Sequence, residues 1–269
     1  MKLGLAQLQI EPGDVSINRT RALDAIEDAA SRGVDLVVLP ELFTVGYFAF
    51  DRYAYAAEPL DGETVTMVSE RANDLDVAVL AGSFVEDLEA SNARGFDTPE
   101  SEGYANTSVF LDKRGEIRGV YRKQHLFGYD SIETELLTPG ESLAVFEFDG
   151  FTVGMTTCYD LRFPELYRQL VERGVTLVAV PSAWPYPRVE HWRILPQARA
   201  IENLCYVAAV NGIGSFDDAT LLGRSALYDP WGTQIAGCGE EPQLVTADLD
   251  PVAVESRRDE FPALSDRRV

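Results

Sequence analysis

Three reactive side chains stand at the ends of apolar runs that lie far apart in the chain. Glu41 ends the segment 37–41, Lys123 lies in the segment 121–125, and Cys158 follows a strand-like run. A carboxylate, an ammonium group and a thiol are the groups that acyl transfer needs when no histidine serves as the base. Because the chain has only three lysines, three cysteines and two histidines, chance is a weaker explanation of these placements than it would be in a richer composition.

The thiol of Cys158 is expected at a strand-to-helix turn, between a strand over 151–157 and a helix that begins near Pro164. A thiol in that position lies near the positive end of the helix dipole, which favours the thiolate. A buried, inert cysteine is the common alternative. The density of polar residues over 159–165 favours a reactive group instead.

The ammonium group and the carboxylates have separate arguments. Lys123 is one of three lysines in a chain with twenty arginines, and an ammonium group can donate to an oxyanion. Apolar surroundings are expected to raise the pKa of Glu41 and to suit it to proton transfer near neutral pH. A second carboxylate could come from Glu133 or Glu135, and the residues by themselves leave that choice open.

Other catalytic and cofactor sites find little support in the sequence. His125 and His191 are the only candidates for a cysteine–histidine or serine–histidine base; His125 is expected either to line the site of Lys123 or to pack as an ordinary histidine. Asp217 stands where a dinucleotide fingerprint starting at Gly212 needs its third glycine. The chain has no Gly-x-Ser-x-Gly elbow, no P-loop and no metal-ligand spacing, so no metal is expected.

The composition restricts partners and compartment. A net charge of −21 argues against nucleic acid or an anionic membrane as a partner. The acidic residues are dispersed along the chain and lysine is scarce, which is typical of a halophilic protein that stays soluble in concentrated salt. We find no apolar run long enough for a membrane span and no signal peptide. The three cysteines are expected to be reduced thiols in a cytoplasmic protein.

No linker-like segment separates the two halves of the sequence, which predicts a single domain over 1–269. The segments 32–40 and 173–181 resemble one another, and each forms a predicted strand that ends at a proline. A duplicated βα layout with helices outside two sheets gives a four-layer α-β-β-α sandwich. We expect 86–103 to be a surface loop. Strands are predicted over 2–10, 34–39, 77–85, 104–111, 116–121, 143–148, 151–157, 175–180, 205–211, 221–229, 233–236 and 243–248, and helices over 19–31, 64–75, 164–173 and 189–203.

In the segments 39–41, 121–127 and 158–165, the chain resembles the nitrilase superfamily of carbon–nitrogen hydrolases, with the signatures in the family's order. The resemblance implies an α-β-β-α sandwich, no metal or organic cofactor, and assembly into homodimers or larger homo-oligomers. It also implies that Cys158 is the nucleophile, Glu41 the general base and acid, and Lys123 the oxyanion donor. Glu133 has the family's offset before a turn at 137–140, so it is the implied second glutamate.

The segment 182–192, followed by 198–203, resembles the omega-amidase branch, which hydrolyses the terminal amide of 2-oxo acids such as 2-oxoglutaramate. Leu204 replaces that branch's usual glutamine. A nitrilase, an N-carbamoyl amidase and a general aliphatic amidase use the same catalytic groups and stay open, as does a non-catalytic binding protein on this fold. The candidate substrate-binding residues are Tyr159, Arg162, Trp184 and His125.

Two further expectations concern Arg162 and the end of the chain. Arg162 either binds a carboxylate at the far end of the substrate or forms an ion pair with Asp160 or Glu165. The stretch 255–269 is too polar for a core and contains the anchors Phe261 and Leu264, so we expect it to cross to a partner subunit.

Overall fold

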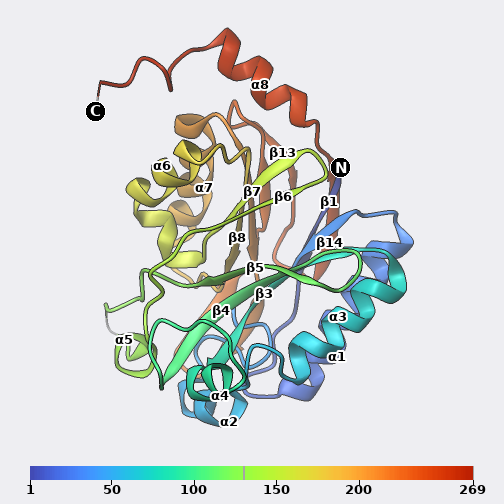
Figure 1. Ribbon diagram of the computed structural model, residues 1–269, viewed down its shortest axis with the longest axis vertical. Coiled ribbons are helices and arrows are strands. Elements are labelled where there is room, and N and C mark those ends of the chain that lie inside the picture. The colour runs from blue at the N-terminus through green and yellow to red at the C-terminus, as the bar shows by residue number, and fades with distance from the viewer. Residues whose placement is uncertain (130, 269) are drawn as a thin grey trace.

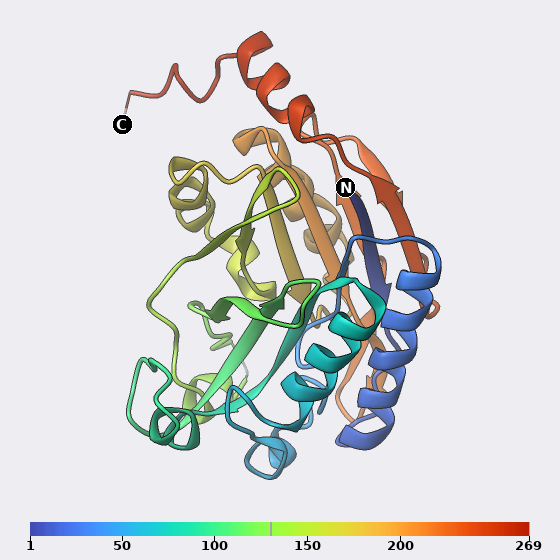
Figure 2. The same ribbon diagram turned by 45° about the vertical axis from the view of Figure 1, so that its right-hand side comes forward.

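The computed structural model describes residues 1–129 and 131–268, and it consists of two six-stranded sheets packed face to face with helices on both outer sides (Figures 1 and 2). The predicted four-layer α-β-β-α sandwich is confirmed. The strand order is β14-β1-β2-β3-β4-β5 in the first sheet and β13-β12-β9-β8-β7-β6 in the second, and β10 pairs with β11 in a separate ribbon.

Each sheet has parallel strands at its centre and antiparallel strands at its edges. β2 pairs in parallel with β1 and β3, and β8 pairs in parallel with β7 and β9. The first sheet contains β14 (Gln243–Asp248), β1 (Lys2–Gln7), β2 (Leu36–Val38), β3 (Ala78–Asp87), β4 (Tyr104–Leu111) and β5 (Ile117–Arg122). The second contains β13 (Gln234–Gly237), β12 (Ala226–Tyr228), β9 (Tyr206–Asn211), β8 (Leu177–Ser182), β7 (Phe151–Met155) and β6 (Ala144–Phe148), and the ribbon is formed by β10 (Ile213–Phe216) and β11 (Ala219–Leu222).

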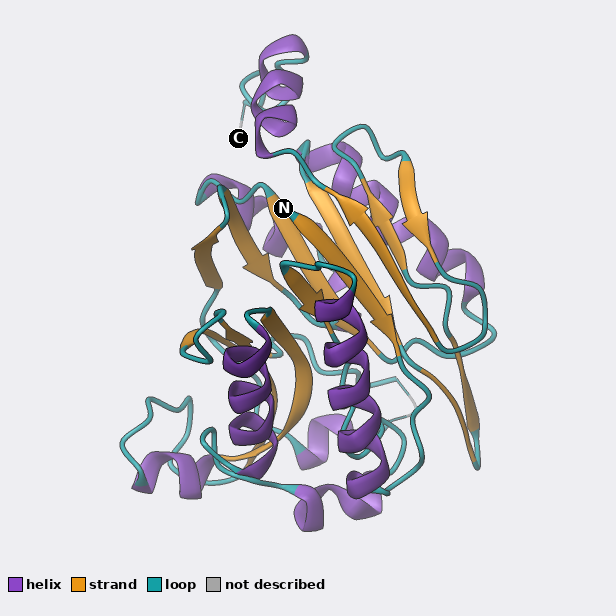
Figure 3. Cartoon of the chain, turned by 90° about the vertical axis from the view of Figure 1, so that its right-hand side faces the viewer, coloured by secondary structure: helices purple, strands orange, loops and turns teal. Residues whose placement is uncertain are grey.

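Apolar side chains fill the space between the sheets and under the helices. The rings of Phe110 from β4 and Phe146 from β6 stack with centroids 3.9 Å apart, which joins the two sheets across the interior. The helices α1 (Val15–Ser31) and α3 (Glu63–Leu75) cover the first sheet, and α6 (Pro164–Glu172) and α7 (Val189–Asn203) cover the second (Figure 3). Burial of one apolar stripe per helix explains why these segments are helical.

Two predicted segments differ from the structure. The expected loop over 86–103 contains the helix α4 (Leu88–Ala93), which begins because the Asp87 carboxylate accepts from the backbone N–H of Ala90 at 2.9 Å. The strand predicted over 221–229 is broken between β11 and β12. Gly223 and Arg224 have φ of +61° and +54°, and two successive left-handed residues cannot continue a strand.

Besides α4, six short or terminal elements were not predicted from the sequence. These are η1 (Phe50–Arg52), α2 (Tyr53–Ala56), α5 (Glu133–Leu136), η2 (Cys158–Arg162), the strand β10 and α8 (Pro251–Glu260). Five of the six have at most five residues, too few for a periodic signal.

The last helix packs on its own chain, and the residues that follow extend toward α6 (Figure 1), where the Arg267 guanidinium pairs with Glu172 at 3.2 Å. Val254 of α8 is fully buried, and the Arg258 guanidinium donates to the backbone carbonyls of Val175 at 2.8 Å and Leu204 at 3.2 Å. Crossing of 255–269 to a partner subunit stays a prediction. No helix in the described ranges has the length and apolar character needed to cross a membrane.

The strands β2 and β8, which come from the two similar segments 32–40 and 173–181, have their carboxyl ends next to one another. After β2, the backbone N–H of Glu41 donates to the carbonyl of Ser182, the last residue of β8, at 3.3 Å. In return, the backbone N–H of Ala183 donates to Glu41 Oε2 at 2.9 Å. The duplicated layout therefore brings the carboxyl end of one central strand in each sheet to a common place.

Candidate active site

The four side chains singled out for catalysis meet at this place. Lys123 Nζ lies 2.9 Å from Glu41 Oε1 and 2.8 Å from Glu133 Oε1. The Cys158 thiol lies close enough to the Glu41 carboxylate and to the backbone N–H of Ala183 for both to affect its pKa, and Cys158, Lys123 and Ala183 line one cavity. Cys158 is 8% exposed, and the other three side chains are at most 1% exposed. Segments more than 100 residues apart thus supply one compact, water-excluded cluster.

Lys123 is held on both sides by backbone hydrogen bonds. Its N–H donates to the Asn106 carbonyl at 2.9 Å, and its own carbonyl accepts from the N–H of Gly140 at 2.9 Å. A Cβ at Gly140 would lie 2.1 Å from the Arg122 carbonyl oxygen. The turn at 137–140 therefore requires glycine, because any side chain there would push the lysine segment away.

The structure places Glu133, and not Glu135, beside Lys123. Glu133 is the first residue of α5 and is fully buried, whereas Glu135 is exposed. The Glu133 carboxylate also accepts from the Tyr47 hydroxyl at 2.8 Å and from the backbone N–H of Phe127 at 2.6 Å. The residues alone did not decide between Glu133 and Glu135. The structure places Glu133 in the cluster, and this is the glutamate that the resemblance to the family implies.

Cys158 occupies a strained backbone position. It opens the short 3-10 helix η2 (Cys158–Arg162) and has a φ of +46°, in the left-handed region that is costly for a residue with a side chain. The Asp160 carboxylate stabilises this turn, since it accepts from the N–H of Thr157 at 2.8 Å and from the Tyr121 hydroxyl at 2.6 Å.

Burial and charge keep this cysteine protonated at rest. Burial raises the pKa of the Cys158 thiol well above its usual value, the Glu41 charge raises it further, and Lys123 opposes them only in part. The expectation that the helix dipole favours a thiolate is therefore wrong for the resting state. The predicted helix, α6, begins six residues after Cys158, beyond the five-residue η2, and the buried carboxylate adjacent to the thiol outweighs the effect of its dipole.

The two charged partners of the thiol have raised pKa values for different reasons. Burial raises the pKa of the Glu41 carboxyl, as predicted, against an opposing effect of Lys123. For Lys123, burial would lower the pKa, but the charges of Glu133 and Glu41 outweigh it and leave the pKa well above the usual value. Glu41 is thus poised to take up a proton while Lys123 stays charged.

A small cavity of about 30 Å³ opens at the thiol, and three of the four predicted binding residues line it. The Arg162 guanidinium lies over the Trp184 ring at 5.0 Å and the Tyr159 ring at 5.6 Å, and it donates to His191 Nδ1 at 3.1 Å. In the described part of the chain, Arg162 forms no ion pair with Asp160 or Glu165. The cavity is lined by Tyr47, Phe48, Lys123, Phe127, Cys158, Tyr159, Arg162, Ala183, Trp184, Pro185 and Arg188.

His125 lies behind this cavity. Its ring stacks on Phe163 with centroids 3.8 Å apart, and its Nδ1 lies 2.7 Å from Asp160 Oδ1. The backbone N–H of His125 also donates to Asp160 at 3.1 Å. His125 therefore ties the lysine segment to the cysteine turn, and it is not among the residues that line the cavity.

Three residues of the site carried too weak a signal to be singled out in the sequence. Tyr47 binds Glu133, Asn106 binds Glu41 at 2.9 Å, and Arg188 lies over the Phe127 ring at 5.2 Å. Arg188 immediately precedes helix α7 and could have been noticed as a cation in a strongly acidic chain. Nothing in the sequence distinguishes the other two from core residues.

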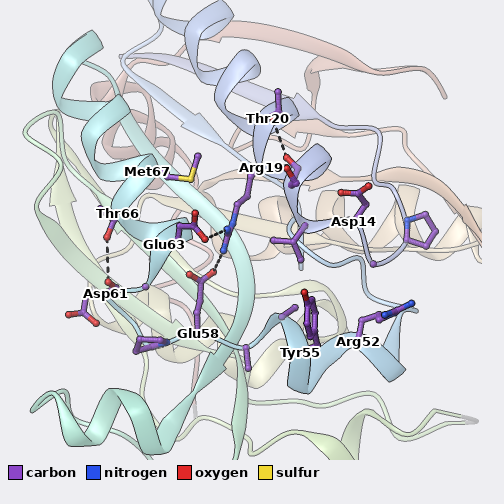
Figure 4. Close-up of a pocket in the computed structure, with 18 of the residues that line it drawn as sticks. Asp14, Arg19, Thr20, Arg52, Tyr55, Glu58, Asp61, Glu63, Thr66 and Met67 are labelled. Carbon is purple, nitrogen blue, oxygen red and sulfur yellow. Dashed lines mark hydrogen bonds and ion pairs between the residues drawn. The ribbon is translucent and has the colours of Figure 1, made fainter.

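Larger hollows lie outside the reactive cluster. One of about 740 Å³ shares Phe48, Phe127, Pro185 and Arg188 with the cavity at the thiol, so it forms the vestibule of that cavity. Another of about 1080 Å³ lies by α1 and α3 (Figure 4). There Arg19 is paired with Glu58 and Glu63, so its charge is satisfied and the hollow contains no comparable reactive cluster. Across 1–129 and 131–268, no three His, Cys, Asp or Glu side chains are grouped as a metal site needs.

Comparison with known proteins agrees with this geometry. The carbon-nitrogen hydrolase family model matches residues 2–259. The chain is 36% identical to 2-oxoglutaramate amidase of Paenarthrobacter nicotinovorans, over 97% of this chain and 90% of that protein. It is 32% identical to human omega-amidase NIT2, over 99% and 95%. Nit3 of Saccharomyces cerevisiae, a nitrilase-superfamily member, superposes with a TM-score of 0.87 at 30% identity, over 100% of this chain and 97% of that one.

Proposed function

Because this chain belongs to the carbon-nitrogen hydrolase family, we propose that it is an amidase that hydrolyses the terminal amide of a 2-oxo dicarboxylic acid monoamide and releases ammonia. Relatives named 2-oxoglutaramate amidase and omega-amidase, at 31–36% identity over nearly the whole chain, support this substrate class. The observation that carries the proposal is the buried contact of Glu41, Lys123 and Cys158 beside a cavity lined by an arginine.

In the first half of the reaction, Glu41 takes the proton of the Cys158 thiol as the sulfur attacks the amide carbonyl carbon. Lys123 has three N–H donors: one is directed at Glu41 and one is shared by the two oxygens of Glu133, so the third serves the developing oxyanion. A backbone N–H near Tyr159 is the proposed second donor. In a variant of the Nesterenkonia amidase, 30% identical to this chain with a TM-score of 0.81, acrylamide has added to the active-site cysteine, which supports a cysteine nucleophile here.

In the second half, Glu41 returns its proton to the departing nitrogen, and ammonia leaves behind a thioester on Cys158. Glu41 then removes a proton from water, and the resulting hydroxide attacks the thioester carbonyl. The acid product leaves as the sulfur regains a proton from Glu41. Glu133 holds Lys123 charged through this cycle, because it remains hydrogen-bonded to Nζ at 2.8 Å and 3.1 Å.

The far carboxylate of the substrate is assigned to Arg162. Its guanidinium lines the cavity that also contains the thiol, and its described neighbours are aromatic rings and His191 instead of carboxylates. Arg188 supplies a second cation where this cavity meets the vestibule. Two cations in a chain of net charge −21 favour an anionic substrate over a neutral one.

The test is ammonia release, in molar salt, from 2-oxoglutaramate, glutaramate, an N-carbamoyl amino acid, a neutral aliphatic amide and a nitrile, with Cys158→Ala as the blank. Fast release from the 2-oxo acid amide is expected. Arg162→Met should raise KM for that substrate at least tenfold and leave KM for any neutral amide nearly unchanged; Arg173→Met, on the exposed surface, is the matched control. If ammonia is released only from another compound, the proposed substrate class is wrong and the proposed catalytic residues still stand.

We further propose that the protein is a cytoplasmic homo-oligomer from a salt-rich setting. The excess of 44 acidic over 23 basic residues, with lysine used only three times, supports the adaptation to salt, since salt screens the mutual repulsion of surface carboxylates. Activity and free energy of unfolding should both increase between dilute buffer and molar potassium chloride. A protein most stable without salt would contradict this.

A further inference from the structure

Asn106 contacts two of the proposed catalytic residues at once. It lies in β4 and is fully buried. Its side-chain Nδ2 donates to Glu41 Oε1 at 2.9 Å, and its backbone carbonyl accepts from the N–H of Lys123 at 2.9 Å. Among the described residues, Asn106 is the only one that hydrogen-bonds both to the side chain of Glu41 and to the backbone of Lys123.

The hydrogen bonds to Glu41 divide its two oxygens between two tasks. Oε1 accepts from Asn106 Nδ2 and from Lys123 Nζ, each at 2.9 Å. Oε2 accepts from the N–H of Ala183 at 2.9 Å, and Ala183 lines the cavity at the thiol together with Cys158. Oε2 is therefore the oxygen on the thiol side, and it keeps a free lone pair.

We propose that Asn106 is a positioning residue for the proposed amidase reaction: it holds Glu41 Oε1 so that Oε2 alone faces the Cys158 thiol and the leaving nitrogen. The inference rests on the proposed function, because it assigns Asn106 a task in that reaction. Asn106 acts through Glu41 and does not itself touch the reacting atoms.

The unused end of the amide supports this assignment. Asn106 Oδ1 is buried and has no hydrogen-bond partner within the described chain. An unpaired buried oxygen is costly, and a leucine of similar size would fill this strand position without that cost. The useful part of this amide is therefore its N–H donor, which hydrogen-bonds to Glu41.

The contact also changes the basicity of Glu41. A donor to the ionised carboxylate stabilises the charged form, so its loss raises the pKa of the carboxyl. The proton shared by Glu41 and Cys158 should then be released at a higher pH, and the titration belongs to the coupled pair. The other charged or titratable groups that face Glu41 are Lys123, Glu133, Cys158, Tyr47 and Tyr53, and an Asn106 substitution changes none of these side chains.

The experiment compares Asn106→Leu with Asn203→Leu. Asn203 is an equally buried asparagine whose Oδ1 is also unpaired, but it lies at the end of α7 and bonds to the Arg199 carbonyl. Two pH profiles are recorded: the rate of Cys158 alkylation by iodoacetamide, which needs no substrate, and kcat/KM for the amide that the wild type hydrolyses. Asn106→Val, a β-branched residue suited to a strand, is the second variant if the leucine variant does not fold.

The acid limb of both profiles should move up by about one pH unit in the Asn106 variant, and kcat should fall at least tenfold with KM nearly unchanged. Asn203→Leu should leave both acid limbs in place. A folded Asn106 variant with the wild-type acid limb, or an equal shift in the Asn203 variant, would overturn the inference. If the wild type releases ammonia from no compound, the proposed function fails, and the alkylation profile still decides the role of Asn106.

Discussion

Replacing Lys123 by methionine tests the buried charge cluster most directly. The substitution keeps the length of the side chain and removes its charge, which leaves two carboxylates without their common partner. Nζ lies 2.9 Å from Glu41 and 2.8 Å from Glu133, and all three side chains have 0% exposure. Breaking a buried ion pair from one side typically costs about 3–5 kcal/mol. Loss of one oxyanion donor typically reduces the rate by about 10²–10³.

The loss of stability should depend on pH in a known direction. Without Lys123, the largest opposition to the effect of burial on the pKa of Glu41 is lost, and the repulsion between Glu41 and Glu133 adds to that effect. The carboxyl pKa of Glu41 in the folded state therefore rises further above its unfolded value. The folded state then binds more protons than the unfolded state, so stability decreases as pH rises through this raised pKa. The deficit relative to the wild type should be larger at pH 8 than at pH 5.

Urea unfolding at both pH values, together with ammonia release, measures these effects. Lys113→Met is the matched control, since Lys113 pairs with Asp35 at 2.9 Å where both side chains are 34% exposed. An exposed pair of this kind contributes about 0.2–1 kcal/mol, and the control should retain full activity. The reasoning is refuted if the two lysine variants lose the same stability, or if the Lys123 variant keeps more than about a tenth of the activity.

Three further outcomes are expected. In the pH profile of kcat/KM, the pKa of the acid limb should be higher than that of an ordinary glutamate, because burial raises the pKa of Glu41 and the base must be ionised. An acid limb with the usual pKa of a glutamate would contradict this. Iodoacetamide should alkylate Cys158 before Cys205 and Cys238, whose pKa values burial raises to about 12 and about 11 without an adjacent base; equal labelling, measured by peptide mass spectrometry, would favour a binding protein. A chain ending at Ser256 should elute as a smaller assembly in size-exclusion chromatography, and an unchanged oligomer would remove the proposed crossing of the tail.

Local patterns in the sequence predicted much of the fold. The strand β14 and the helix over 189–203 have the predicted bounds, because alternation and helical spacing are written into consecutive residues. The helix α4 was missed because its start depends on one carboxylate, that of Asp87, in a polar segment. The break at Gly223 and Arg224 was missed because a left-handed pair in an apolar run leaves the hydrophobic pattern unchanged.

Residue types and order were enough to single out Glu41, Lys123, Cys158 and Glu133, because few side chains can perform acyl transfer and this chain contains few of them. The protonation states were decided only by the tertiary structure. The turn at Cys158 suggested a thiolate, whereas the folded chain buries the thiol beside Glu41 and raises its pKa. The contacts of Asn106, Tyr47 and Arg162 with their partners also depended on the fold, since burial and long-range contacts exist only once distant strands meet.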